Sequence, residues 1–259
     1  MAIFKHRKRP EEWSLARGRA KYPWMIPFHG IEWALRWIAY LLSGWAFLEV
    51  LEYLGTLSLL LAAVSYFSES GNRLKQKHYM AWQVINSAQS KGGNGGRIDA
   101  LEELLADGVP LVGVDVSDAF LQGIDLGGAD LVRANFRGAD VRRGNLSKSR
   151  LQYADLSSAN FRGANLRSAN LQKASLEDAD LNGTDLSESD LQGANLSKAD
   201  LRTAELRDCK WEKISDIKMA NILGIKNPPP GFEKWALENG AVSVESDNDW
   251  QALISRSGK

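Results

Sequence analysis

Apolar side chains recur every five residues over nearly half of the chain. From Val109 the sequence divides into units of five, and the third position is apolar in 21 consecutive units that end at Lys213. The first position of each unit is small or β-branched. A period of five fits neither the 3.6-residue α-helix nor the two-residue strand. The pattern predicts a solenoid that turns a corner in every unit and buries one large and one small side chain per unit.

These units resemble the pentapeptide-repeat family, whose pattern is small, Asp or Asn, Leu or Phe, polar, then Gly or polar. ADLSS at 154–158 and ANFRG at 159–163 follow this pattern. The resemblance implies an all-β, right-handed quadrilateral β-helix with four units per coil and with Leu and Phe stacked inside. It covers residues 109–224, because two further units follow an extra residue, Ile214, that shifts the frame. The Asp and Asn at the second position are expected to bond neighbouring backbone at the corners.

The coil edge at the start of the repeats needs a cover, because unpaired edges are prone to aggregate. Residues 92–108 begin with the Gly-rich joint GGNGG and continue as RIDALEELLADG. This composition predicts a short capping helix with Asp99 as its N-terminal cap and Gly108 at its C-terminal end.

A second cover is predicted at the end of the repeats. Residues 225–241 contain three consecutive prolines, followed by a helical segment that presents Phe232 and Trp235 and stops at Gly240. We expect these aromatic side chains to cap the rod. Residues 242–259 are polar and are expected to form a flexible tail.

The first third of the chain is predicted to be helical and to associate with a membrane. Residues 1–30 form a basic arm, 31–68 are mostly apolar, and 69–91 have the spacing of an amphipathic helix. We expect membrane association through residues 31–68, as an α-helical hairpin whose turn contains Glu49, Glu52, Tyr53 and Gly55. Four tryptophans of this region suit the depth of the membrane interface, with helix packing as the alternative: Trp24, Trp33, Trp37 and Trp45.

Two other arrangements of residues 31–68 stay open. A single span near 46–67 would bury Glu49 and Glu52, each at up to ~3 kcal/mol if central. A soluble pair of helices is the third arrangement, since charged residues recur in this segment.

Basic residues flank the apolar segment on both sides, within residues 5–21 and 73–77. Lys and Arg near membrane segments prefer the cytoplasmic side. A hairpin keeps both flanks there, which predicts a repeat domain at the cytoplasmic face of the cell inner membrane. A single span would instead keep the larger N-terminal set inside and place the repeat domain outside. The Gly-rich joint would let the rod swing with its basic side chains near anionic lipid.

Charge and composition offer no catalytic centre. The formal net charge is +0, and the repeats 109–224 hold 17 acidic and 15 basic residues. Relatives that imitate DNA need a strongly acidic surface, so nucleic acid is not expected as a partner. The three histidines lie far apart, and neither a GxSxG, a P-loop nor an HExxH motif occurs. We therefore expect no catalytic residues, no cofactor and no metal, and a buried structural role for the single cysteine, Cys209.

Basic residues are concentrated in two coils of the predicted rod. Residues 20 apart would stack, so Arg142 and Arg162 become neighbours in a column that continues with Asn182 and Arg202. A bound anion, an acidic protein surface or a lipid headgroup would compensate this charge, and a solvated face neutralised by Asp140 is the alternative. The candidate interaction surface, called the basic belt below, consists of Arg133, Arg137, Arg142, Arg143, Lys148, Arg150, Arg162, Arg167 and Lys173.

The features together predict a membrane-tethered, non-catalytic scaffold or protein-interaction module with a protein partner that the sequence does not identify. Two alternatives are kept. One is an inhibitor or protector of a nucleic-acid enzyme such as a topoisomerase, acting by duplex-like shape. The other is anion or lipid-headgroup binding through the basic belt. Association of the chain with copies of itself also stays open.

Overall fold

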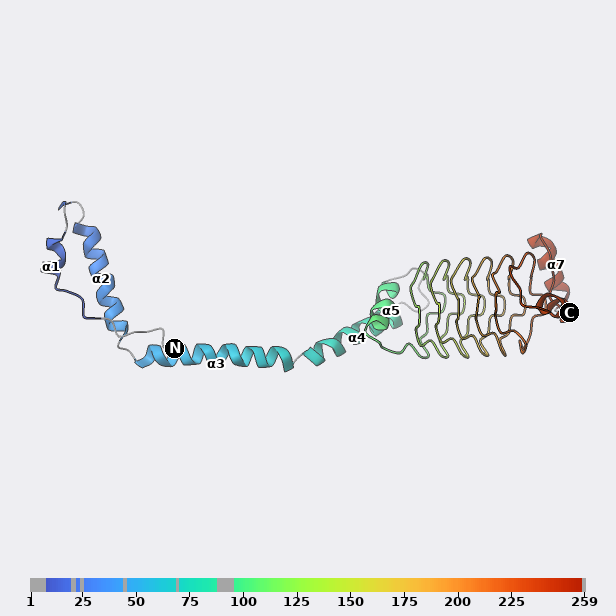
Figure 1. Cartoon of the computed structure of the whole chain (residues 1–259), viewed down its shortest axis with the longest axis horizontal. Helices are drawn as coiled ribbons and strands as arrows, with labels where there is room; N and C mark the ends of the chain where they lie inside the picture. The colour runs from blue at the N-terminus through green and yellow to red at the C-terminus, as the bar shows by residue number, and fades with distance from the viewer. Residues whose placement is uncertain are drawn as a thin grey trace. The chain divides into compact units, whose positions relative to one another are not determined.

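The computed structural model describes residues 8–19, 22–23, 26–43, 46–68, 70–87 and 96–257. The chain divides into two compact units, Met1–Leu74 and Lys75–Lys259. Figure 1 shows the helices and the stacked coils of the second unit. The helices of the described residues are α1 (Trp13–Gly18), α2 (Ile26–Ser43), α3 (Ala46–Ser68), α4 (Ser70–Ser87), α5 (Arg97–Ala106), α6 (Phe232–Glu238) and α7 (Asp247–Ser257).

In the first unit, α1 packs against one side of α2. The ring centroids of Trp13 and Trp33 are 5.6 Å apart, and those of Trp33 and Trp37 are 6.2 Å apart. Trp33 Nε1 also donates a hydrogen bond of 2.7 Å to Glu11 O. Trp33 and Trp37 thus serve helix packing in this unit, while the other two tryptophans expected at the interface, at positions 24 and 45, lie outside the described residues.

Helix α3 runs without interruption through Glu49, Glu52, Tyr53 and Gly55. The turn expected there is wrong: Leu, Ala and Glu are strong helix formers, and one Gly costs a helix only about 1 kcal/mol. Among the described residues, α3 alone is long and apolar enough to cross a membrane, with Val50–Phe67 as the apolar window. This window places Glu52 near one end rather than at the centre.

The second unit is a coil whose successive turns lie in parallel register. Parallel β-bridges join residues 20 apart, beginning with Asp115 and Asn135 and continuing through residue 210. Backbone hydrogen bonds repeat at the same interval, as where Leu166 N donates to Asp185 O at 2.8 Å. Four units of five residues therefore make one coil, as expected.

The interior of the coil is filled by the predicted positions. Third-position side chains from Leu111 through Leu206 are 0–1% exposed, and the first-position residues are buried beside them. Second-position side chains bind the backbone two residues ahead: Asp185 Oδ1 accepts from Ser187 N at 2.9 Å. The expected corner role of the Asp and Asn residues is confirmed, because this bond repeats along the rod.

The fifth position of a unit takes a left-handed backbone conformation. Gly138 has φ +67°, and the same conformation is adopted by non-glycine residues such as Lys148, at +58°. A turn with positive φ at its third residue favours Gly, which accounts for the recurrence of Gly at the fifth position.

The frame shift near the end of the repeats is confirmed, but the extra residue is Ser215. Ile214, expected to be the insertion, occupies a buried first position. Ser215 N donates to Ala194 O at 2.8 Å, while Asp216 O accepts from Leu196 N at 2.7 Å. Two residues thus stand where other coils have one, as in a β-bulge, and the next bridges join residues 21 apart.

Two helices cover the first coil. Ala81 and Ile85 of α4 and Leu101 and Leu104 of α5 are buried in the cluster that continues into the coil at Leu111. The second half of α4 is therefore part of the rod. The expectation that the Gly-rich joint lets the rod swing away from α4 is wrong, because α4 packs on the coil. Residues 92–95 of the joint lie outside the described residues.

Ion pairs join α4 to α5. Lys77 Nζ lies 2.9 Å from both Glu103 Oε1 and Asp107 Oδ2, and His78 Nε2 lies 3.0 Å from Asp107 Oδ2. Hydrogen bonds from Lys77 and then His78 hold the pKa of Asp107 below its usual value. The pairs fix the face that α4 presents to the rod.

The ends of α5 are only partly as predicted. The helix begins at Arg97 with Gly96 as its N-terminal cap, so Asp99 lies in the first turn and is not the cap. Gly108 does end the helix, since its N–H donates to Leu105 O at 2.9 Å and that of Val109 donates to Leu104 O at 2.9 Å.

An aromatic cluster covers the last coil. Phe232 of α6 is fully buried, and the Trp211 ring lies 5.7 Å from it and 5.2 Å from the Trp235 ring, measured between centroids. Gly240 ends α6 with φ +93°. The predicted capping helix is present.

The C-terminal segment is not a flexible tail through residue 257. Val242 pairs with Asn221 in a further parallel bridge, and α7 follows. Trp250 of α7 is buried and donates from Nε1 to Met219 O at 2.8 Å. The tail prediction is wrong because one large aromatic residue in a polar segment suffices to dock a short helix on the rod.

Leu166 tests the interior of the rod. We expect Leu166→Asp to unfold it, because an unpaired charge would be buried among stacked leucines. Leu166→Ala should lower the free energy of unfolding by about 2–5 kcal/mol through loss of contacts and the cavity left behind. Thermal and denaturant melts followed by circular dichroism measure both. The exposed Arg137→Ala is the matched control, with a change of about 0.5 kcal/mol or less; an unchanged melt for Leu166→Asp would contradict the inward assignment.

Candidate interaction surfaces

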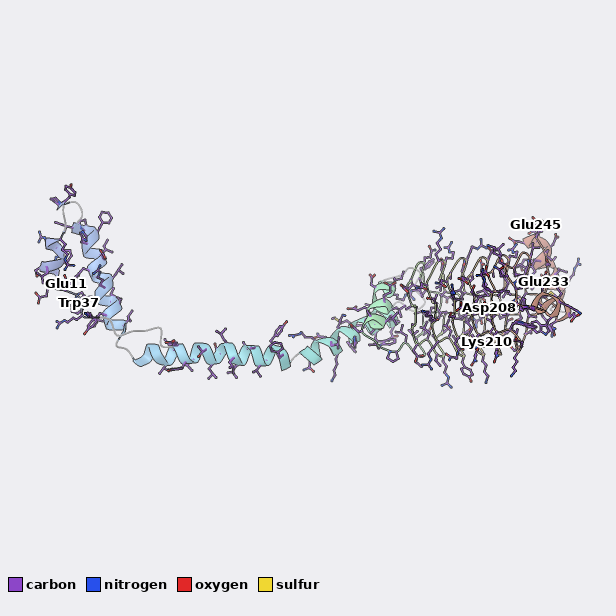
Figure 2. The ribbon with its side chains drawn as sticks, in the orientation of Figure 1. Glu11, Trp37, Asp208, Lys210, Glu233 and Glu245 are labelled. Carbon is purple, nitrogen blue, oxygen red and sulfur yellow. The ribbon has the colours of Figure 1, made fainter. Side chains whose placement is uncertain are left out.

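The outside of the rod is the surface available for recognition, since its interior is filled. Side chains project all round the coil, Asp208 and Lys210 among them (Figure 2). No group of His, Cys, Asp and Glu in the described residues could hold a metal ion.

The basic belt is distributed around the rod. Residues 20 apart share a side of the coil, so Arg142 and Arg162 lie on one side, and Arg133 and Lys173 lie on another. Arg137 stands on a third side. The belt is therefore a ring and not one continuous patch.

Arg142 and Arg162 are brought together as expected. Both line a shallow hollow, whose other lining residues are Gln122, Gly123, Arg143 and Gly163. Arg142 Nη2 lies 2.7 Å from Asp140 Oδ2, and Arg162 Nη2 lies 3.0 Å from Asp180 Oδ2. The Arg142 guanidinium is the main reason that the pKa of Asp140 falls to about 2. Arg142 and Arg162 thus each have a carboxylate beside them.

Other belt residues are paired across coils. Arg150 Nη1 lies 2.9 Å from Asp130 Oδ2, and Arg167 forms an ion pair with Glu188. Exposed ion pairs of this kind contribute roughly 0–1 kcal/mol each. Their larger effect is that they reduce the positive potential of the belt.

Arg133 and Lys173 flank an exposed tyrosine. The Arg133 guanidinium lies 6.0 Å and the Lys173 ammonium 5.2 Å from the Tyr153 ring centroid. Tyr153 is 53% exposed. Sequence reasoning missed this column, although the 20-residue spacing of the three residues would have shown it.

Arg202, the last residue of the column that contains Arg142 and Arg162, is engaged by other residues of the chain. Arg202 Nη2 lies 2.7 Å from Asp200 Oδ2, Arg202 Nη1 lies 2.7 Å from Asp247 Oδ1, and the guanidinium lies 5.6 Å from the Trp250 ring. The Asp200 carboxylate is the main cause that raises the pKa of Arg202. Arg202 therefore anchors α7.

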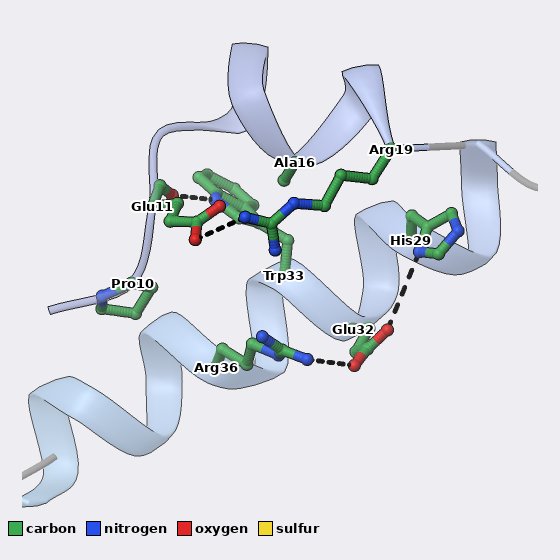
Figure 3. A pocket seen from close by; sticks show the side chains of 8 residues that line it. All are labelled: Pro10, Glu11, Ala16, Arg19, His29, Glu32, Trp33 and Arg36. Atoms are coloured by element: carbon green, nitrogen blue, oxygen red, sulfur yellow. Dashed lines mark hydrogen bonds and ion pairs between the residues drawn. The ribbon is translucent and has the colours of Figure 1, made fainter. Parts of the chain in front are cut away.

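The first unit contains a small cavity that sequence reasoning missed. It measures about 150 Å³ and lies between α1, the segment before it and α2 (Figure 3). Two ion pairs border it, Arg19 with Glu11 at 2.7 Å and Arg36 with Glu32 at 2.6 Å. The basic groups beside the cavity are already engaged with carboxylates, so it is not built as an anion site.

Residues 111–208 match the family described as pentapeptide repeats, in eight copies over 111–147, 145–183 and 169–208. The chain belongs to the pentapeptide-repeat family. The 20-residue register of its coils agrees with this assignment, and the right-handed quadrilateral β-helix is the fold that family membership implies.

Several solved pentapeptide-repeat structures are similar to the chain. One from the Arabidopsis thaliana thylakoid lumen is 26% identical, with 51% of this chain and 83% of that chain covered and a TM-score of 0.24. One from Nostoc PCC 7120 is 36% identical, with 39% and 84% covered and a TM-score of 0.23. The plasmid-mediated fluoroquinolone resistance protein QnrB1 is 19% identical, with 58% and 64% covered and a TM-score of 0.31.

The chain thus spans slightly less than two thirds of QnrB1. A comparison with curated proteins gives no match. The family assignment rests on the repeat match, and the role of the basic belt stays a prediction.

Cys209 tests the first-position packing. Burial is the main cause that raises the pKa of its thiol to about 12. Because the thiolate is the reactive form, we expect the native protein to react with a thiol reagent at pH 8 at least 100-fold more slowly than the unfolded chain. Absorbance of the released thiol product, with and without denaturant, measures this. Equal rates would show that Cys209 is not held inside the coil.

Proposed function

We propose that this pentapeptide-repeat protein is a non-catalytic interaction scaffold anchored in a membrane by α3. The observation that carries the proposal is that α3 exposes apolar side chains on all sides. The exposed large residues that point in different directions around the helix include Val50, Leu51, Leu57, Leu59, Leu60 and Tyr66. A helix that is apolar all round needs either a protein core or lipid around it.

The dimensions of α3 support lipid as its environment. Its apolar window Val50–Phe67, of 18 residues, corresponds to about 27 Å at 1.5 Å per residue, close to the hydrocarbon core of about 30 Å. Glu52 lies two residues inside the apolar window Val50–Phe67, where a carboxylate reaches the interface more easily than from the centre.

The rod supplies the interaction part of the proposal. Its interior is filled, and its outer surface carries mixed charge and exposed aromatic side chains, among them Tyr153 between Arg133 and Lys173. Such a surface offers binding contacts but no enclosed pocket with convergent acid and base. Residues 5–21 before α3 hold more Lys and Arg than residues 73–77 after it. Because such residues favour the cytoplasmic side, a single span through α3 keeps the N-terminal segment inside and places the rod on the outer side of the membrane.

Charged substitutions in α3 test the anchor. The full chain should stay with membranes after alkaline carbonate extraction. Leu57→Arg with Leu61→Arg should release most of it, because each arginine near the bilayer centre costs about 2.5–3.5 kcal/mol. Leu57→Ile with Leu61→Ile is the matched control and should stay bound. Release of the unaltered chain by carbonate would overturn the anchor, provided that the melt of the rod is normal.

Thiol labelling tests the side of the membrane. The buried Cys209 is replaced by Ser, and Ser158, which is exposed on the rod, is replaced by Cys. We expect an impermeant maleimide to label Ser158→Cys in cells whose inner membrane is intact, because a single span that keeps the more basic N-terminal flank inside places the rod outside. Labelling only after permeabilisation would place the rod on the cytoplasmic side, and would leave the anchor itself unaffected.

A further inference from the structure

Helix α2 has an apolar face that no described residue covers. Phe28, Ile31, Leu35, Ile38 and Leu42 are between 40% and 67% exposed. Their spacing of three and four residues places them along one side of the helix. This set is called the α2 stripe.

The opposite side of α2 is already occupied. Trp33 packs on Trp13 of α1 and on Trp37. Glu32 and Arg36 form an ion pair beside the cavity (Figure 3), on the flank between this side and the stripe. On a helical projection, Trp33 lies about 160° from both Ile31 and Leu35 at 100° per residue. Helix α1 therefore covers the polar and aromatic side and leaves the α2 stripe free.

We propose that α2 lies in the plane of an anionic membrane surface, with the α2 stripe in contact with lipid. This inference rests on the proposed function, because α3 holds the unit at a membrane. Only residues 44–45 separate α2 from α3 in the chain. The stripe is thus kept near the lipid surface by a tether two residues long.

The net charge of the first unit is complementary to an anionic membrane surface. Lys8, Arg9, Arg17 and Arg19 are exposed in the segment that includes α1, while the acidic residues of that segment are Glu11 and Glu12. The net charge of residues 8–19 is therefore +2, from four basic and two acidic residues. This net positive charge attracts the unit as a whole to an anionic lipid surface, although α1 lies on the side of α2 away from the stripe.

A second span is a poorer account of α2. Its Glu32–Arg36 pair lies near the middle of the helix, where a span would place both charges at the centre of the bilayer. Apolar residues also occupy one side of α2, whereas α3 exposes them on all sides. The in-plane position leaves the ion pair on the flank of the helix, at the level of the lipid headgroups.

Depth measurements on the full chain test the inference. In a Cys209→Ser background, single cysteines replace Phe28, Leu35 and Leu42, and Ser14 on α1 is the matched control. Each cysteine carries an environment-sensitive fluorophore, and the protein is reconstituted in vesicles of phosphatidylcholine with phosphatidylglycerol. We expect the three stripe labels to be quenched several-fold more by shallow than by deep nitroxide lipids, all to a similar extent. The label at position 14 should be quenched by aqueous iodide instead.

Three outcomes would overturn the inference while α3 still resists carbonate extraction. Deep quenching at Leu35→Cys but shallow quenching at the other two would show that α2 spans the bilayer. Stripe labels open to iodide would show that α2 lies in water. Stripe labels shielded equally in detergent and in vesicles, with cross-linking between copies through Leu35→Cys, would show that a second chain covers the stripe. Failure of the carbonate test itself would instead overturn the proposed function.

Discussion

Backbone hydrogen bonds between residues 20 apart hold each coil of the rod to the next, and this register constrains every other position of the second unit. A side chain at any position stands over its counterpart one coil away. Inward positions must therefore be apolar and of compatible size in whole columns. An inserted residue cannot slide the register, and the rod absorbs Ser215 as a local bulge. The register also leaves open backbone edges at both ends, which α4 with α5 and α6 with α7 cover in this chain.

The same stacking decides the electrostatics of the surface. Basic residues are concentrated between Arg133 and Lys173, and the next coil is acidic. Along the chain these groups are separate, but in the rod they face one another, as Arg162 does Asp180 and Arg167 does Glu188. Like charges stacked in one column are therefore compensated by carboxylates from adjacent positions. The rod therefore has a surface of mixed charge, on which Tyr153 lies exposed between Arg133 and Lys173.

The first unit follows a different constraint, because it buries little of its apolar surface within itself. Indole rings hold α1 on one side of α2. The α2 stripe is left exposed, and so are the side chains of α3 between Val50 and Phe67 except that of Glu52. Exposed apolar area of this extent is unusual for a soluble domain and common where lipid or another chain is the partner. Amphipathic and uniformly apolar helices next to each other correspond to two different depths in a bilayer, at its surface and across it.

The sequence by itself determined the coil, its inward positions, the corner role of Asp and Asn and the capping helix at Phe232, because each depends on a local period or on neighbouring residues. It also located the arginine pair at 142 and 162 once the period was known. The tertiary structure alone decided that α4 belongs to the rod, that α7 docks through Trp250, that Ser215 is the bulge and that α3 continues through Glu49–Gly55. These features depend on contacts between distant residues or on small differences in helix energy. The repeat specifies which residues stack on one another in successive coils, whereas the second half of α4, α5 and α7 acquire their positions from the surfaces that the folded rod presents.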